Sequence, residues 1–494
     1  MKTKEEKDLH KKLLEEIVHD LSWGSFSKKT LEGAEKIKQE HIADEIKNRR
    51  DFRNEVCLTI DPKNAKDFDD ALTISQKGHF IEIGVHISDV SHFVTPKSTL
   101  DIEARRRGTS IYLQNRVIPM LPEVLSNDLC SLRPNEDRFT ISVVWQFDTQ
   151  GKIKNTWMGK SIIHSKKRFT YEEVDQILEK KEGVFKDELQ KLLKIAEKLN
   201  EKRISEGSLV LEQEEITFLY DEFSRSYTPT KSVFTKSHML IEEFMLLANK
   251  TVAEFLTKKK YIFPYRIHEL PEKEKVQTLR MVLEPLGFKI GKKIDTRTLS
   301  ELTKHPKLKT YGAFIQSLVL RTLAKARYSI KNKGHFALAF KLYTHFTSPI
   351  RRYPDIISHR ALANALLGKA DYANEAEMEK IMIHATQAER QAQDAERFSL
   401  RIVQTEYMKS FIGEKRQAIV TGITTHGIFA SDVLSGTDGL IHEQNLDKSF
   451  KLFPNRFEAV SKKLKIKIHI GMQITVLVSR VDLDKKLINY ELVL

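Results

Sequence analysis

The sequence contains little cysteine: Cys57 and Cys130 are the two examples among 494 residues. Both lie in apolar runs, and their spacing matches neither a zinc site nor a disulfide framework. Disulfides form in oxidising compartments and are rare where the surroundings are reducing. We therefore predict two buried structural thiols and a cytoplasmic protein.

Long apolar runs are also lacking. No stretch approaches the ~18 apolar residues of a membrane helix, so the sequence predicts no membrane partner. The first residues mix Lys and Glu without an apolar run, and we expect no signal peptide.

Acidic residues are outnumbered by basic ones. The 82 Lys and Arg against 68 Asp and Glu leave a net charge of +14, which favours a polyanionic partner without fixing the fold. The 26 Phe and a hydrophobic content of 40% predict a folded globular chain, whose length allows more than one domain.

Four aspartates nevertheless fall within ten residues: Asp61, Asp67, Asp69 and Asp70. Carboxylates this close repel one another, and some would have to stay protonated unless a cation were present. Oxygen ligands suit Mg²⁺, which then tends to take substrate phosphate as a further ligand, with Mn²⁺ as the alternative ion. A solvated acidic turn is the other interpretation of this cluster.

The residues around the cluster predict strands. Residues 56–60 read as a strand that Pro62 ends, and strand character resumes at 71–74. Residues 80–87 alternate apolar and polar side chains, the period of a half-buried strand. The mid-loop Gly and distal Glu of an EF-hand are missing at their spacing. We expect the aspartates on a tight loop braced by a sheet.

The run from Asp61 to Ala71 resembles the catalytic signature of the RNB exoribonucleases, the ribonuclease II and ribonuclease R group. Further blocks keep the family's order over roughly residues 45–405: 86–93, 107–113, 117–122, 125–132, 241–249 and 345–360. The resemblance implies a monomeric Mg²⁺-dependent enzyme. It would degrade single-stranded RNA processively from the 3′ end and release nucleoside 5′-monophosphates.

The resemblance also assigns catalytic residues. Asp61, Asp67, Asp69 and Asp70 match the family's metal ligands, and Asp69 matches the one most critical to cleavage. Arg351 matches an arginine whose planar guanidinium suits the scissile phosphate. Glu396 matches a glutamate near the 3′ nucleotide, with a salt bridge on the helix surface as the alternative.

A second set of family positions concerns RNA binding. Tyr112 matches an aromatic that stacks on the terminal base, with a core tyrosine as the alternative. Glu243 lies on the apolar side of its predicted helix and is chosen over Glu242. Arg352 is a weaker candidate than Arg351. Leu211 stands near the position of a second stacking aromatic, which predicts a one-sided clamp and a different shortest product.

We predict an α+β fold in three parts. Residues 1–50 form a helical extension, 51–410 the RNB catalytic domain with a mixed sheet and surrounding helices, and 415–494 an OB-fold barrel of the ribosomal S-one type. Helices are expected over 170–205, 235–410 and 355–367, and extended chain over 334–342. A strand is also expected between 203 and 217.

The two ends of the chain carry their own expectations. Leu9, Leu13, Ile17 and Leu21 form one apolar stripe, either a packing strut or a helix that binds a protein partner. This extension is too short for the OB-type cold-shock domains that larger family members carry upstream. In the barrel, Phe429 and His442 match RNA-binding positions, with the barrel core as the alternative place for Phe429.

Two rival functions follow from the same residues. A catalytically silent RNA-binding protein would carry a degraded acidic loop, whereas this loop is intact. An endonuclease or a DNA-directed nuclease could use the same metal site.

Overall fold

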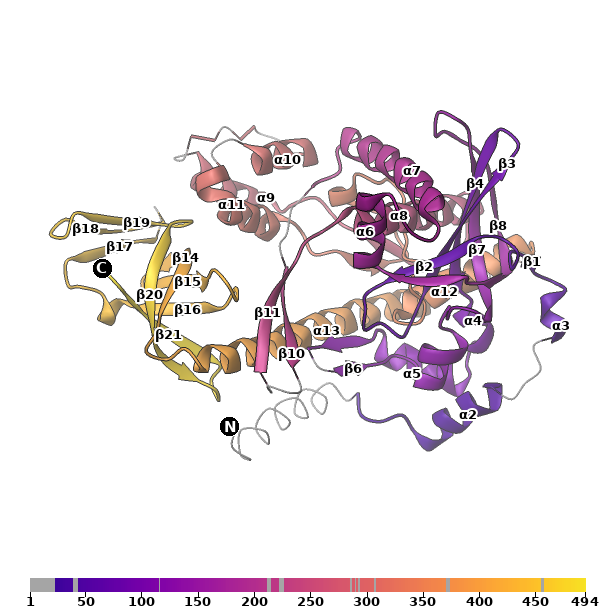
Figure 1. The fold of residues 1–494 in the computed structure, drawn as a ribbon, viewed down its shortest axis with the longest axis horizontal. Helices are drawn as coiled ribbons and strands as arrows, with labels where there is room; N and C mark the ends of the chain where they lie inside the picture. Colours follow the sequence, from indigo (N-terminus) through magenta and orange to yellow (C-terminus); the bar gives the residue numbers. More distant parts are fainter. Residues whose placement is uncertain are drawn as a thin grey trace.

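The computed structural model describes residues 23–494 apart from 39–42, 115, 211–214, 222–225, 285–286, 289, 292–293, 306–307, 370–373 and 455–456. Figure 1 shows a large α+β lobe and a small β lobe, with helix α13 (Glu375–Lys409) running between them. This helix contacts β5 and β13 in the large lobe and β20 and β21 in the small one. It therefore connects the two lobes as one continuous element.

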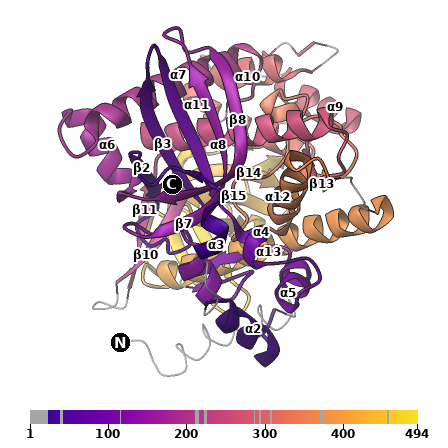
Figure 2. The same ribbon diagram turned by 90° about the vertical axis from the view of Figure 1, so that its right-hand side faces the viewer.

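The large lobe is built on a seven-stranded sheet with strand order β1-β8-β7-β4-β3-β2-β9. Helices α6, α7 and α8 cover one face; in Figure 2, α7 and α8 lie behind the strands and α6 lies beside them. Val85 and Trp145 of the sheet are buried in one cluster with Leu192 of α7 and Phe244 of α8. Each such side chain contributes about 1.5–3 kcal/mol on burial.

The strands of this sheet have the following bounds: β1 (Arg50–Asp51), β2 (Cys57–Asp61), β3 (Asp70–Lys77), β4 (Phe80–Ser88), β7 (Asp137–Phe147), β8 (Ile153–His164) and β9 (Lys167–Thr170). The strands predicted around the aspartates are thus confirmed. The prediction of one solvated face for 80–87 is wrong, because every residue of β4 from Glu82 onward is buried. His86 on the second face contacts the ring of Phe52 at 4.7 Å between centroids.

Three two-stranded pairs complete the large lobe: β5 (Ile111–Leu113) with β6 (Arg116–Ile118), β10 (Glu215–Asp221) with β11 (Ser226–Ser232), and β12 (Tyr265–Ile267) with β13 (Arg327–Ser329). The strand expected between 203 and 217 begins only at Glu215. The extended chain expected over 334–342 is instead interrupted by a 3₁₀ turn, η2 (Phe336–Leu338), because His335 caps it by accepting the Leu338 N–H.

Helices occupy most of the described residues in the predicted helical regions, although β12 and β13 interrupt the region 235–410, and α4 and α5 form where no helix was predicted. The helices are α2 (Lys28–Lys38), α3 (Ala43–Ile46), α4 (Val90–Phe93), α5 (Thr99–Arg107), α6 (Tyr171–Lys180), α7 (Lys186–Ser205), α8 (Lys236–Lys258), α9 (Lys273–Leu283), α10 (Thr296–Lys304), α11 (Leu308–Thr322), α12 (Tyr353–Leu366) and α13. Helix α12 begins two residues before the predicted start, with Pro354 in its first turn. The apolar stripe from Leu9 to Leu21 lies outside the described residues.

The small lobe is a closed five-stranded barrel of order β14-β15-β16-β21-β20, which confirms the OB-fold prediction. Its strands are β14 (Lys415–Thr424), β15 (Gly427–Asp432), β16 (Asp438–His442), β20 (Gln473–Asp482) and β21 (Leu487–Leu492). Between β16 and β20 the chain adds a three-stranded sheet of β17 (Phe450–Phe453), β18 (Glu458–Ser461) and β19 (Ile466–His469).

Two composition-based predictions can be compared with the structure. Cys57 and Cys130 are both buried and free, as predicted. Among the described residues, no helix is long and apolar enough to cross a membrane.

Candidate active site

The four aspartates lie where β2 ends and β3 begins. Asp61 is the last residue of β2 and Asp70 the first of β3, while Asp67 and Asp69 lie in the loop between them. Ser131 anchors this loop, because its hydroxyl donates to the Lys66 carbonyl at 2.7 Å and accepts the Phe68 N–H at 3.0 Å. The Leu132 N–H also donates to the Phe68 carbonyl. The loop is therefore held from outside its own strands.

Burial makes the carboxyl groups of Asp61, Asp69 and Asp70 difficult to ionise, because it raises the pKa of each. Burial and then the charge of Asp70 raise the pKa of Asp61 to about 8. Burial also raises the pKa of Asp70 to about 6 and that of Asp69 well above its usual range, in both cases against the opposing charge of Arg351. The protein alone does not supply enough positive charge to keep all of them ionised at neutral pH.

The residues present fit a divalent cation. The Oδ2 atom of Asp61 is buried and has no hydrogen-bond partner among the described residues. The donor atoms offered by the four side chains are all carboxylate oxygens, the type that hard cations prefer. Within the described part of the chain, no three His, Cys, Asp or Glu side chains are already grouped closely enough to hold an ion.

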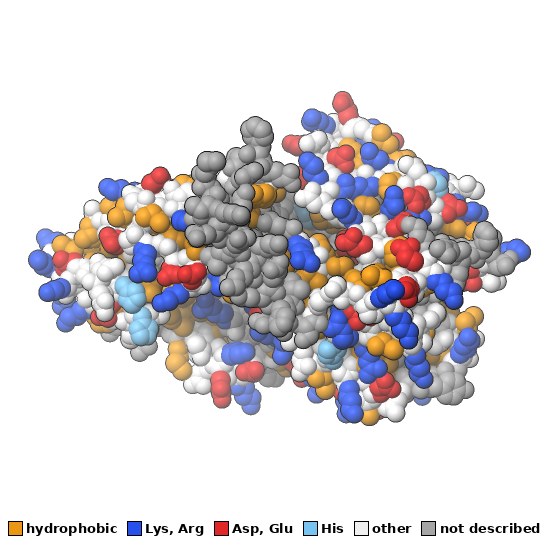
Figure 3. All heavy atoms as spheres, turned by 90° about the horizontal axis from the view of Figure 1, so that it is seen from below, with side chains coloured by type: hydrophobic (Ala, Val, Ile, Leu, Met, Phe, Trp, Pro, Cys, Tyr) orange, Lys and Arg blue, Asp and Glu red, His pale blue; other side chains and the backbone are white. Residues whose placement is uncertain are grey.

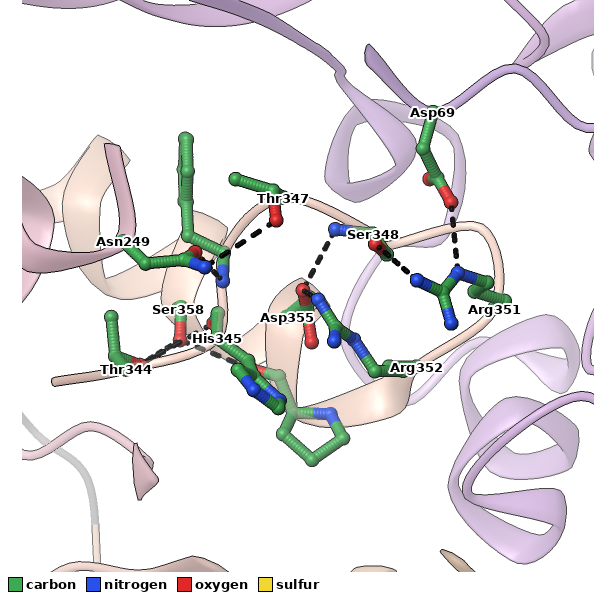
Figure 4. A network of polar contacts seen from close by, with 12 residues as sticks. Asp69, Asn249, Thr344, His345, Thr347, Ser348, Arg351, Arg352, Asp355 and Ser358 are labelled. Atoms are coloured by element: carbon green, nitrogen blue, oxygen red, sulfur yellow. Dashed lines mark hydrogen bonds and ion pairs between the residues drawn. The ribbon is translucent and has the colours of Figure 1, made fainter. Parts of the chain in front are cut away.

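A loop distant in sequence closes over Asp69. The Ile350 N–H donates to Asp69 Oδ1 at 2.9 Å, and Arg351 Nε lies 3.8 Å from Asp69 Oδ2 (Figure 4). The Arg351 guanidinium also donates to Ser348 Oγ at 3.0 Å, yet its side chain is 42% exposed. Arg351 is therefore fixed beside the acidic loop and accessible to a phosphate.

Arg352 has a different environment. Its guanidinium donates to Asp355 Oδ1 at 2.7 Å, and the same oxygen accepts the Ser348 N–H. Although burial acts to lower it, the pKa of Arg352 is raised by Asp355. To contact RNA, the Arg352 guanidinium would have to bind a phosphate while it stays paired with the buried Asp355 carboxylate. Figure 4 shows the Arg352 side chain turned toward Asp355.

Tyr112 joins three parts of the site. Its hydroxyl donates to Asp67 Oδ2 at 2.7 Å, and its backbone N–H donates to Glu396 Oε1 at 3.1 Å. Burial and then the charge of Asp67 raise the pKa of the Tyr112 hydroxyl, which keeps it a proton donor at neutral pH. The contact to Glu396 favours a place in the site over a salt bridge on the helix surface.

Small residues allow α13 to approach the strand that carries Tyr112. Ala388, Ala392 and Ala395 are buried with Ile111 and Leu113 in one cluster. The fit is close at Gly108, where a Cβ would come within 2.8 Å of the Ala388 Cβ and where φ is +72°. Glu396 follows this alanine stripe directly and is thereby brought to the Tyr112 backbone.

A cavity of about 1430 Å³ opens beside these groups. Its lining includes Asp67 and Tyr112 together with Trp23, Phe26, Arg116 and Phe218. The cavity is large enough for several nucleotide units, and both stacking surface and positive charge line it. Leu211, the predicted weak side of the clamp, lies outside the described residues.

Glu243 is buried on α8, and its carboxylate is paired with Arg203, as a carboxylate on the apolar side of a helix requires. Arg203 of α7 donates to Glu243 Oε1 from Nε at 2.9 Å and from a terminal nitrogen at 2.6 Å. Burial raises the pKa of Glu243 against this pairing. Its predicted contact with RNA stays a prediction. Arg203 itself was not found from the sequence, because 40 residues separate the two side chains.

The barrel residues lie apart from the catalytic loop. Phe429 on β15 is 37% exposed, which places it on the barrel surface and not in the core. His442 ends β16 and is exposed. Both positions are open to an RNA strand, and their role in binding stays a prediction.

Sequence reasoning missed several residues that shape the site. Trp23 is buried against Ile111 and the alanine stripe, although nothing in its sequence context indicates a partner. Tyr171 follows β9 directly, and after burial the charges of Asp70 and Asp61 raise its pKa. The parallel pairing of β9 with β2 explains this proximity, but the sequence offers no signal for that pairing.

Comparison with known proteins identifies the family. Residues 49–368, more than half of the chain, match the model of the RNB domain. This chain belongs to the RNB family. Residues 409–491 match the S1 RNA binding domain. This chain is 36% identical over 497 residues to Ribonuclease R of Thermotoga maritima, and the match covers 97% of this chain and 69% of the relative.

Solved structures agree with this RNB assignment. Mycoplasma genitalium RNase R, in complex with ribose methylated single-stranded RNA, has a TM-score of 0.89 at 29% identity, covering 98% of this chain and 78% of that one. Yeast Ssd1, a pseudonuclease, shares the fold with a TM-score of 0.69 at 20% identity, covering 89% and 54%. Because a pseudonuclease has this fold, the RNB architecture alone does not establish catalysis.

Proposed function

We propose that this chain hydrolyses single-stranded RNA processively from the 3′ end, releases nucleoside 5′-monophosphates and uses Mg²⁺. The broader class follows from the RNB domain together with the 36% identity to Ribonuclease R: it is a 3′-to-5′ exoribonuclease that acts on RNA and requires a divalent metal. The observation that carries the proposal is the acidic loop, in which Asp61 and Asp69 are buried, closed by Ile350 and Arg351.

Each group in this site has a proposed role. Asp61, Asp67, Asp69 and Asp70 would hold the metal, which supplies an activated water and neutralises the scissile phosphate. Arg351 would bind the non-bridging oxygens of that phosphate, because its guanidinium is fixed at Asp69 and exposed on its other side. The Tyr112 ring would stack on the terminal base while its hydroxyl orients Asp67.

The remaining expectations stay proposals of the same kind. Arg352, Glu243 and Glu396 would contact RNA near its 3′ end, and Phe429 and His442 would guide the strand at the barrel. We keep the division at residues 51–410 and 415–494, a monomeric state and a cytoplasmic location, which the two free thiols support. The N-terminal extension would serve as a strut or as a site for a protein partner.

The first test uses a 5′-labelled single-stranded RNA with Mg²⁺, Mn²⁺ or EDTA, resolved on a sequencing gel over time. We expect a short limit product and released monophosphates with Mg²⁺ and none in EDTA. Asp69→Asn should abolish hydrolysis and spare RNA binding, whereas Asp187→Asn in the first turn of α7, where the side chain is 71% exposed, should change neither. Equal loss of binding and hydrolysis in Asp69→Asn would contradict the role given to Asp69.

The rival functions have separate tests. A circular RNA must stay intact, because an exonuclease needs a free end, and its cleavage would identify an endonuclease. A DNA oligomer of the same sequence must also survive if contacts to the 2′-OH select RNA. Intact linear RNA under both metals, with binding retained, would identify a silent RNA-binding protein.

A further inference from the structure

The three-stranded sheet β17–β18–β19 has two chemically different faces. Its inner face packs on the barrel through alternate residues of each strand: Phe450, Leu452, Ala459, Ile466 and Ile468. These belong to the same hydrophobic cluster as the barrel strands. The sheet is therefore a fixed part of the small lobe, and the other alternate residues must point away from the barrel.

The register of the strands defines the outer face. Lys451 is paired with Val460, which is paired with Lys467. In the next row, Phe453 is paired with Glu458, which is paired with His469. Cross-strand neighbours share a face, so two lysines lie beside an aromatic ring. Lys451 and Lys467 are exposed, and Phe453 is 37% exposed.

Positive charge predominates around this face. The turn between β18 and β19 adds the exposed residues Lys462, Lys463 and Lys465. Glu458 pairs with Lys467 at 2.6 Å, whereas in the described part of the chain no carboxylate forms an ion pair with Lys451. Figure 3 shows Lys and Arg side chains, with some Asp and Glu among them, at the end of the molecule that holds the small lobe. This charge would attract a polyanion.

The sheet is also held relative to the catalytic lobe. Phe457, which follows β17, contacts Phe314 of α11 with 5.4 Å between ring centroids. Both rings lie at the junction of the barrel cluster with the cluster of α9 to α11. A ligand bound on the outer face would therefore keep a fixed position relative to the large lobe.

We propose that the outer face of β17–β18–β19 is a second RNA-binding surface, separate from the barrel surface that carries Phe429. Lys451 and Lys467 would contact backbone phosphates and Phe453 would stack on a base. RNA is the favoured occupant because the face continues an S1 RNA binding domain and combines lysines with an exposed ring. This second surface depends on the proposed function in one respect: the RNA that it binds would be the substrate that the enzyme degrades.

The test separates charge from stacking in the full-length protein. Binding of a single-stranded RNA of about 30 nucleotides is measured over a series of salt concentrations, in EDTA to prevent cleavage. Lys451→Gln/Lys467→Gln should reduce the slope of log K against log salt by about 0.7 for each phosphate that is no longer neutralised. Phe453→Ala should weaken binding about tenfold without changing the slope.

Matched controls use the opposite end of the molecule. Lys152→Gln/Lys154→Gln removes the same charge from two exposed lysines in the β7–β8 turn and at the start of β8, far from the barrel in Figure 1, and should leave the slope unchanged. Cleavage of an RNA of about six nucleotides should keep its kcat and KM in all variants, because so short a substrate occupies only the catalytic cavity.

The outcomes are distinct. Unchanged affinity and slope in both face variants would overturn the proposal and leave this face to another occupant, such as an acidic protein. An equal loss in the Lys152/Lys154 control would show a non-specific effect of net charge and would also overturn it. If the wild-type protein binds the long RNA but cleaves no RNA, the proposed function fails while the second surface stands.

Discussion

The roles proposed for the hydroxyl and for the ring of Tyr112 differ, and substitution can measure each. Tyr112→Phe removes one hydrogen bond to the Asp67 carboxylate, 2.7 Å long, and keeps the ring. A hydrogen bond to a charged group is worth about 1.5–3 kcal/mol, so losing it corresponds to roughly tenfold to a hundredfold. Because Asp67 is a proposed metal ligand, we expect this loss in kcat/KM, together with a higher Mg²⁺ requirement.

Tyr112→Ala also removes the stacking surface, which is worth about 1–3 kcal/mol per base. The limit product should therefore become longer in Tyr112→Ala and stay unchanged in Tyr112→Phe. The assay follows a 5′-labelled RNA to completion at several Mg²⁺ concentrations and compares initial rates with final lengths. Wild-type rates and Mg²⁺ requirement in Tyr112→Phe would refute the orienting role of the hydroxyl. A longer product in that variant would refute the division between hydroxyl and ring.

Two further predictions concern stability and the N-terminal segment. Burial and the charge of Asp70 raise the pKa of Asp61 to about 8 in the metal-free folded protein. Between about pH 4 and about pH 8 the folded protein therefore holds a proton that the unfolded chain releases. The free energy of unfolding must fall as the pH rises through this range. In EDTA at pH 8, the Asp61→Asn variant should therefore unfold at a higher denaturant concentration than the wild type, and this difference should vanish near pH 4. Lower stability of the variant than of the wild type at pH 8 would contradict this. Trp23→Ala should cost about 3 kcal/mol in unfolding free energy and also lengthen the limit product, because Trp23, 4% exposed, packs on the strand of Tyr112 and the helix of Glu396. Leu270→Ala, at a site 69% exposed, is its control, and a loss of stability without a change in product would make Trp23 a core residue only.

The acidic loop was the part of the site that local sequence could predict. Pro62 cannot continue β2, and the apolar runs on both sides of the loop have to be strands, so the four aspartates had to share a short connection. Their mutual repulsion indicated a cation before any fold was known. The same local logic found α12, where Pro354 lies in the first turn and Gly368 follows the end.

Tertiary contacts limited what else the sequence could predict. The alternation of residues 80–87 indicated one solvated face, but the pattern cannot reveal that Phe52 covers it. His335 caps a 3₁₀ turn within residues that looked extended, since a side-chain acceptor competes with strand pairing. Arg203 and Glu243 could not be paired from spacing, because they lie on different helices. Family resemblance, not local pattern, brought Arg351 into the site.

The contacts of the site form a closed ring. The Asp67 carboxylate accepts a hydrogen bond from the Tyr112 hydroxyl, and the backbone N–H of Ser110, two residues before Tyr112, donates to the Arg351 carbonyl. The Arg351 side chain lies beside Asp69, which belongs to the same loop as Asp67 and so closes the ring. The ring joins the group proposed to stack on the terminal base to the groups proposed to hold metal and phosphate. A base that seats correctly on Tyr112 would therefore stabilise the arrangement of Asp67 and Arg351 that cleavage requires. On this argument, hydrolysis depends on how the terminal base is seated, so removal of the whole Tyr112 side chain must lower the rate as well as lengthen the product.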